Sequence, residues 1–185
     1  MNYPNSPGVH QFRKQILALS GEDASKCIQC GKCTAGCPIS PEMDLQPNQV
    51  IHFIQINDPQ TVLGCRTIWL CASCRTCSVR CPAEIEIAKI MDLLRKLSLE
   101  EKVPYGEKRV VKFDEIFLGT VKKRGRVHEL ELMMRYNLAV GQPFKDAHLG
   151  PRMLAKGKLH FLGQKVKGLD QIGEIFSKSK RFFKP

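Results

Sequence analysis

Twelve residues near the N-terminus read Cys27-Ile-Gln-Cys30-Gly-Lys-Cys33-Thr-Ala-Gly-Cys37-Pro38. The same cysteine spacing returns in Cys71-Ala-Ser-Cys74-Arg-Thr-Cys77-Ser-Val-Arg-Cys81-Pro82. Both runs follow the pattern C-x2-C-x2-C-x3-C-P, with equivalent positions 44 residues apart. This pattern is typical of the cysteine run that binds a [4Fe–4S] cluster in bacterial-type ferredoxins. The duplication therefore predicts two [4Fe–4S] clusters bound by eight of the nine cysteines.

The spacing has a geometric reason. Three cysteines at intervals of three let a short loop wrap around one face of a cuboidal cluster, and in two-cluster proteins the fourth cysteine binds the other cluster. The proline that follows lacks an N–H group and fixes the chain direction. We therefore expect crossed ligand sets, one made of Cys27, Cys30, Cys33 and Cys81, and the other of Cys71, Cys74, Cys77 and Cys37.

Zinc is the alternative metal for these cysteines, and the role of the ninth cysteine is a separate question. Structural zinc sites usually divide their ligands into separated C-x2-4-C pairs, which two identical four-cysteine runs do not resemble. Cys65 lies outside both runs. It is either a redox-active or substitute ligand or a small buried hydrophobic residue, and we favour burial. Trp69, two residues before Cys71, either covers a cluster or packs in the core.

Apolar residues recur at helical spacing along the first hundred residues, where no alternating strand pattern stands out. The helix faces comprise Val9, Phe12, Ile16 and Leu19 before Gly21, then Val50, Ile51 and Ile54 after Pro47, and finally Ile87, Ile90, Met91, Leu94 and Leu97 after Pro82. We therefore expect a mainly α protein. Residues 1–26 would form an N-terminal segment with a short helix, and residues 27–102 a helical ferredoxin-like domain rather than a compact β-sheet ferredoxin.

Residues 103–185 are expected to form a helical, basic extension. Its predicted helix faces comprise Val110, Phe113, Phe117 and Val121, then Val127, Leu130, Met134 and Leu138, and last Leu169, Ile172, Phe176 and Phe183. Gly125 and Gly141 are expected to end the first two helices, while residues 151–157 are ambiguous. Short amphipathic helices of this kind favour packing against a partner over a second full core.

The charge is unevenly distributed between the two halves. The chain carries a net charge of +11; residues 1–100 hold ten basic and nine acidic residues, and residues 101–185 hold nineteen and nine. The basic residues are dispersed among apolar helix faces without a nucleic-acid motif, which favours a solvated face or a docking surface for acidic subunits over a nucleic-acid-binding surface. No apolar stretch is long enough for a membrane span, and the N-terminus does not resemble a signal peptide. A cytoplasmic location is the simplest expectation.

The two runs, CIQCGKCTAGCP and WLCASCRTCSVRCP, resemble the C subunit of heterodisulfide reductases and their bacterial relatives. The segment Met43-Asp44-Leu45-Gln46-Pro47 and the helix beginning near Ile85 add to this likeness, which covers residues 27–100, and the ending Lys165–Phe176 resembles the family more weakly. The linker between the two runs resembles the bacterial members of the family more closely. This likeness implies a complex that acts on related sulfur compounds, either by reducing or by oxidising them. Similar two-cluster domains also form part of the iron–sulfur subunits of succinate dehydrogenase and glycolate oxidase.

The resemblance implies an electron relay without substrate chemistry on this chain. In that family the C subunit passes electrons between a flavin-bearing A subunit and a B subunit, where paired-cysteine CCG motifs act on a disulfide. No adjacent cysteines occur here. Two alternatives stay open: a free dicluster ferredoxin or a subunit of another flavoprotein oxidoreductase, and a redox-sensing nucleic-acid-binding protein.

Overall fold

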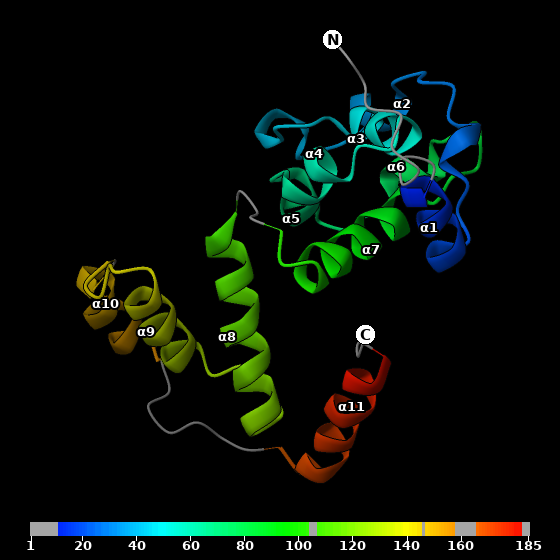
Figure 1. Ribbon diagram of the computed structural model, residues 1–185. Coiled ribbons are helices and arrows are strands. Elements are labelled where there is room, and N and C mark those ends of the chain that lie inside the picture. Colours follow the sequence, from blue (N-terminus) through cyan, green and yellow to red (C-terminus); the bar gives the residue numbers. More distant parts are fainter. Residues whose placement is uncertain (1–10, 104–106, 146, 158–165, 183–185) are drawn as a thin grey trace. The chain divides into compact units, whose positions relative to one another are not determined.

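The computed structural model describes residues 11–103, 107–145, 147–157 and 166–182, and divides into two compact units, Met1–Glu107 and Lys108–Pro185. Every regular element in these ranges is a helix (Figure 1), so the predicted mainly α class is confirmed. Within the same ranges, no helix has the length and apolar character needed to cross a membrane.

The first unit holds seven α-helices and two 3-10 turns within its described residues. In chain order they are α1 Gln11–Ser20, η1 Ala24–Lys26, α2 Lys32–Ala35, η2 Ser40–Glu42, α3 Pro47–Gln55, α4 Pro59–Gly64, α5 Thr67–Leu70, α6 Thr76–Val79 and α7 Ile87–Glu100. Helix α7 contacts α1, α4, α5 and α6, and α3 contacts α1, α2 and α4. The long helix α7 is therefore the element around which much of this unit packs.

The core of the first unit consists largely of the predicted helix faces. Its buried members include Phe12, Ile16, Val50, Ile51, Ile54, Val62, Leu63, Ile68, Ile87, Ile90, Met91, Leu94 and Leu97. Leu19 was expected on the face of α1 but is 54% exposed, whereas Ser20 in the same turn is buried, so the covered face of α1 runs through Phe12, Ile16 and Ser20. Val9 lies outside the described residues.

Two helices between the cysteine runs, α4 and α5, were not predicted. Helix α4 begins after Asp58, whose carboxylate accepts the N–H of Thr61 at 3.1 Å, with Pro59 in the first turn. That Asp-Pro pair is a recognisable helix start, but six residues show too little periodicity to reveal the helix. Helix α5 has only four residues and depends on contacts from elsewhere in the chain.

Those contacts come from Asp44. Its carboxylate accepts the backbone N–H groups of Arg66 at 2.7 Å and Thr67 at 2.9 Å, together with the Thr67 hydroxyl at 2.7 Å. Burial alone would raise the pKa of Asp44, but these hydrogen bonds outweigh burial and leave that pKa below its ordinary value. Asp44 therefore fixes the segment that leads into Cys71 against the linker that follows Cys37.

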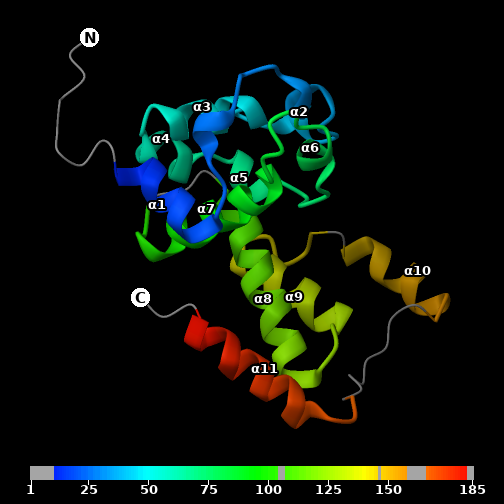
Figure 2. The ribbon, with the colours of Figure 1, turned by 90° about the vertical axis from the view of Figure 1, so that its right-hand side faces the viewer.

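The second unit contains α8 Lys108–Arg124, α9 Glu129–Ala139, η3 Ala147–Leu149, α10 Gly150–Ala155 and α11 Leu169–Phe182. Helices α8 and α9 form a hairpin, and α11 packs against α8 (Figure 2). Helix α8 ends before Gly125 and α9 before Gly141, and both glycines have positive φ angles, as helix C-termini favour.

The predicted apolar faces of α8 and α9 were wrong in phase. The residues buried there are Val111, Ile116 and Thr120 on α8 and Leu132 on α9. Phe113 and Phe117 stay 39% and 36% exposed, although Phe113 packs edge-on against Tyr136 with ring centroids 5.5 Å apart. Apolar residues occupy a wide arc of α8, and periodicity alone does not show which part of the arc is covered.

Gly125 should be intolerant of substitution. Its φ of +78° is strained for other residues, and a Cβ atom there would overlap the side chain of Val166 and lie 2.8 Å from Ile172 Cδ1. We expect Gly125→Ala to lower the free energy of unfolding of the second unit by about 1–3 kcal/mol, measured by denaturant titration of the full chain followed by circular dichroism. Gly119→Ala is the matched control, because nothing lies within 4 Å of its added Cβ and alanine favours a helix. Equal losses in both variants would contradict this assignment.

Candidate metal centre

The two cysteine runs fold into two copies of one backbone shape. The residue before the second cysteine is left-handed in both runs (Gln29, φ 56°; Ser73, φ 48°), and so is the residue after it (Gly31, φ 73°; Arg75, φ 62°). A four-residue helix then begins at the same position of each run, α2 at Lys32 and α6 at Thr76. The internal sequence repeat is thus a structural repeat, in which two left-handed residues curl each loop around its cysteines.

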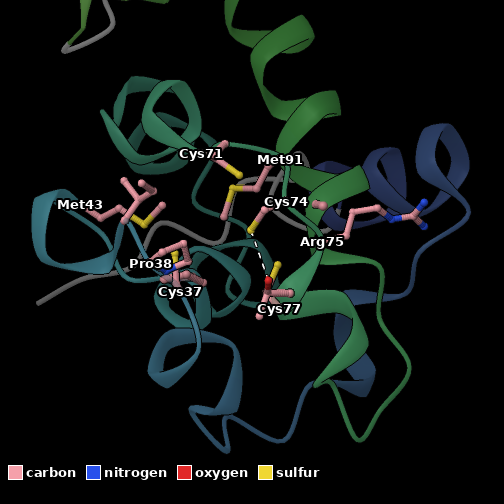
Figure 3. Close-up of a pocket in the computed structure, with 13 residues that line it drawn as sticks. Cys37, Pro38, Met43, Cys71, Cys74, Arg75, Cys77 and Met91 are labelled. Atoms are coloured by element: carbon pink, nitrogen blue, oxygen red, sulfur yellow. Dashed lines mark hydrogen bonds between the residues drawn. The ribbon is translucent and has the colours of Figure 1, made fainter.

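Each loop borders a cavity that takes its fourth cysteine from the other run. The first site, as we call it, is lined by Cys27, Cys30, Cys33 and Cys81, and the second site by Cys71, Cys74, Cys77 and Cys37. Figure 3 shows the four sulfur atoms of the second site facing a common space, while the Arg75 side chain points away from it. The structure therefore brings together the two groups of four cysteines that the sequence predicted.

The composition of these cavities suits an iron–sulfur cluster. Besides its four thiols, the first site is lined by Ile28, Gly31, Asn48, Pro82, Ala83 and Ile87. The second is lined by Pro38, Ile39, Met43, Pro47, Ala72, Arg75, Thr76, Ala88 and Met91. Four soft thiolate donors in a largely apolar lining are the ligands that iron–sulfur clusters take. The residues present therefore fit the group.

Among the described residues, no group of three or more His, Cys, Asp or Glu side chains lies close enough together to hold one metal ion. A cuboidal cluster distributes its four thiolates over four separate irons, so its ligands stand farther apart than those of one ion.

The thiols differ in burial in the same way at both sites. Cys33 is buried, and burial raises its pKa. Burial likewise raises the pKa of the equivalent Cys77, with the neighbouring Cys71 adding to the effect. The second cysteines, Cys30 and Cys74, are exposed. The Thr76 hydroxyl lies 3.5 Å from Cys74 Sγ, and this hydrogen bond lowers the pKa of Cys74 (Figure 3). Each site therefore reaches solvent at its second cysteine.

The helix that follows each run supports the loop with a polar side chain. From α3, Gln55 Nε2 donates to the Cys27 carbonyl at 2.9 Å and to the Ala24 carbonyl at 3.0 Å. From α7, Arg95 Nη2 donates to the Cys71 carbonyl at 2.6 Å. Sequence reasoning missed both residues. The available signal was a polar residue beside an apolar face: Gln55 next to Ile54, and Arg95 next to Leu94.

The two runs also pack directly against each other at equivalent positions. A Cβ atom on Gly36 would lie 2.7 Å from Arg80 Nη1 and 2.8 Å from Arg80 Cδ, so the Arg80 side chain occupies the space beside this glycine. Helices α2 and α6 are in contact as well. The absence of a side chain at Gly36 therefore lets the ends of the two motifs approach closely.

Cys65 and Trp69 line neither cavity. Cys65 is buried, its thiol donates to the Val62 carbonyl at 3.1 Å, and burial raises its pKa to about 11. Trp69 is 8% exposed and belongs to the core. A buried, protonated thiol suits the structural role that we favoured for Cys65.

Comparison with known proteins finds similarity to iron–sulfur proteins. Residues 23–85 match the family described as the 4Fe-4S dicluster domain. The chain is also 34% identical over 91 residues to the C subunit of the ferredoxin:CoB-CoM heterodisulfide reductase of Methanosarcina acetivorans, covering 49% of this chain and 36% of that protein. It is 29% identical to the C subunit of the H(2):CoB-CoM heterodisulfide,ferredoxin reductase of Methanothermobacter marburgensis, over 46% of each chain.

A third relative, the C subunit of the ferredoxin:CoB-CoM heterodisulfide reductase of Methanosarcina mazei, is 34% identical over 52% of this chain and 60% of its own length. The chain thus spans between about a third and three fifths of these relatives. The closer likeness to bacterial members, expected from the linker, stays a prediction.

Over residues 23–85 the chain is similar to the 4Fe-4S dicluster domain, and this match includes all eight cysteines that line the two cavities. Over about half of its length the chain is similar to the C subunits of heterodisulfide reductases.

The crossed ligand sets can be tested with one substitution. Cys37 precedes Pro38 in the first run but lines the second site, so Cys37→Ala should damage the second cluster and leave the first largely intact. We expect about eight iron and eight sulfide per wild-type chain, from two clusters of four, and about half in the variant, measured anaerobically with EPR spectra of the remaining cluster.

Cys65→Ser serves as the control, because Cys65 is a cysteine outside both sites, and it should keep both clusters and their EPR signals. Loss of the Cys27 cluster in Cys37→Ala would contradict the crossing. Stoichiometric zinc without sulfide in the wild-type chain would contradict both clusters.

Proposed function

We propose that this chain is the electron-transfer subunit of a heterodisulfide-reductase-like complex. The observation that carries the proposal is the pair of cysteine-lined cavities formed by two interleaved copies of one motif. A [4Fe–4S] cluster bound in each would accept and release single electrons. The proposed ligands are Cys27, Cys30, Cys33 and Cys81 at the first site and Cys37, Cys71, Cys74 and Cys77 at the second.

The linings of the two sites support electron relay without substrate chemistry on this chain. Neither lining contains a carboxylate or an imidazole that could act as an acid or base. The thiols that would be needed for disulfide chemistry are all proposed as ligands, apart from the buried Cys65. Reduction of a disulfide would therefore take place on a CCG-type B subunit, with a flavin-bearing A subunit at the other end of the relay.

The second unit has the properties of a docking surface for these partners. It carries exposed apolar side chains on several helices and in the turn after α9, among them Leu118, Met134, Leu138, Phe144 and Ile175. Dispersed basic residues surround them. Apolar contacts at an interface supply affinity, and opposite charges steer association and set specificity. The proposed partners are accordingly acidic where they meet this unit.

Eight reduced thiols also suit a reducing compartment, so we place the complex in the cytoplasm.

The alternatives make different demands on the second unit. A free dicluster ferredoxin has no use for a basic, partly apolar unit of this size, whereas a subunit of another flavoprotein oxidoreductase would use it in the same way. A redox-sensing nucleic-acid-binding protein would show affinity for duplex DNA that falls steeply with salt. The identity of the copurifying subunits separates the first two, and the salt series tests the third.

Removal of the second unit should separate cluster binding from docking. A chain ending at Glu107 keeps every proposed ligand, and it keeps the carboxylate that pairs with Arg66 at 3.1 Å. We expect this chain to bind as much iron and sulfide as the full chain but to lose copurification with a CCG-type subunit and to fail to support turnover. Full-length protein expressed beside the same partner is the control. Tight complex formation by the shortened chain would contradict the docking role.

A further inference from the structure

The two loops differ in the charge of the group that holds their first cysteine. At the first site the Cys27 carbonyl accepts a neutral amide from Gln55, at 2.9 Å. At the second site the Cys71 carbonyl accepts a guanidinium from Arg95, at 2.6 Å. Because the two loops otherwise repeat one backbone shape, this exchange of an amide for a cation is a specific electrostatic difference between two equivalent positions.

Arg95 is held firmly in this position. Its Nε donates to the Ile68 carbonyl, Nη1 lies 2.9 Å from Asp92 Oδ1, and both terminal nitrogens lie 3.4 Å from Ser73 Oγ. Ile68 and Ser73 belong to the segment that enters and forms the second loop. The guanidinium therefore touches this segment before, at and after Cys71, which keeps its charge beside the loop.

The carboxylate that pairs with Arg95 lies on the solvent side. The Arg95 side chain is 25% exposed, whereas the Asp92 side chain is 58% exposed. Water screens an exposed charge more strongly than a partly buried one. Asp92 Oδ1 also accepts the Ser73 hydroxyl of this loop at 3.0 Å. The guanidinium, however, is the group that contacts the backbone of Cys71, a proposed ligand, so the positive charge is the one held beside a ligand.

Other groups near the sites produce smaller differences. Arg75 lines the second site but pairs with Glu86 at 2.6 Å, both side chains are well exposed, and its side chain points away from the thiols (Figure 3). Neutral groups contact thiols at both sites. Gln29 Nε2 and the Ile85 N–H each donate to a sulfur of the first site at 3.4 Å, and the Cys74 thiol of the second site donates to Thr76 Oγ1 at 3.5 Å. The runs also carry the cations Lys26, Lys32 and Arg80, but their side chains are exposed, so water screens their charges. Arg95 is instead partly buried and bonded to the backbone of a proposed ligand.

We propose that Arg95 raises the reduction potential of the second site, Cys37, Cys71, Cys74 and Cys77, above that of the first. Reduction adds a negative charge to a bound cluster, and a nearby fixed cation favours the reduced state. An electron received by this chain then rests preferentially at the second site, which sets a direction inside the relay. This inference rests on the ligand sets of the proposed function and adds a residue that tunes one of them.

The test is a redox titration of the full-length chain carrying reconstituted clusters, followed by EPR, with signals assigned through Cys37→Ala and Cys81→Ala. We expect two midpoints in the wild-type chain, the higher one belonging to the second site. Arg95→Gln reproduces the neutral amide of the first site, and should lower only the second midpoint. A tenfold change in the reduction equilibrium corresponds to 59 mV for one electron. Lys96→Gln, which removes a charge paired with Glu100 on the same helix, should leave both midpoints unchanged.

Two further variants decide the matter if Arg95→Gln fails to hold the second cluster. Asp92→Asn removes the counter-charge and should raise the second midpoint, while Arg95→Lys keeps the charge and should retain most of the wild-type difference. A higher midpoint at the first site of the wild-type chain, an unchanged second midpoint in both Arg95→Gln and Asp92→Asn, or equal shifts at both sites would overturn the proposal. Failure of the proposed ligand sets would be seen separately, as missing clusters in the wild-type chain.

Discussion

Each cysteine run places its last thiol in the cavity of the other run, and this exchange governs the architecture of the first unit. Neither group of four thiols is complete until both runs lie side by side, although 33 residues separate Cys37 from Cys71. The intervening helices, the Asp44 hydrogen bonds to the start of α5, and the approach of Arg80 to Gly36 all serve that one juxtaposition. Helix α7 then packs against both the early and the late helices, so one core supports two sites.

The two cysteine runs share one backbone conformation but differ in the side chains around their cysteines. The same left-handed positions occur in both loops, yet one is glycine in the first run and arginine in the second, Gly31 and Arg75. The first loop is supported by neutral amides, and the second by a guanidinium. A duplicated scaffold with different side chains around it can give two sites equal in shape and unequal in redox properties, which is what a directional relay needs.

The sequence predicted the thiol groups and the main helices for physical reasons that are local. The cysteine spacing predicts the two loops directly. Pro47 predicts the start of α3, and the apolar face from Ile87 to Leu97 predicts α7. It did not reveal α5, which is held by Asp44 from 23 residues away, or the roles of Gln55 and Arg95, which depend on tertiary contacts. The phase of α8 was missed because Val111 and Phe113 are both apolar, and only packing selects between them.

The exposure of Cys30 and Cys74 has a consequence for the survival of the protein in air. The second thiol of each site lies at the surface while the third lies deeper, Cys33 being buried and Cys77 half-buried. An electron gains a short path to a partner at such an edge, but dioxygen and peroxide reach the same edge when no partner covers it. Oxidative loss of iron would then begin at the corner held by the second cysteine, and a docked subunit would protect the cofactor as well as exchange electrons with it.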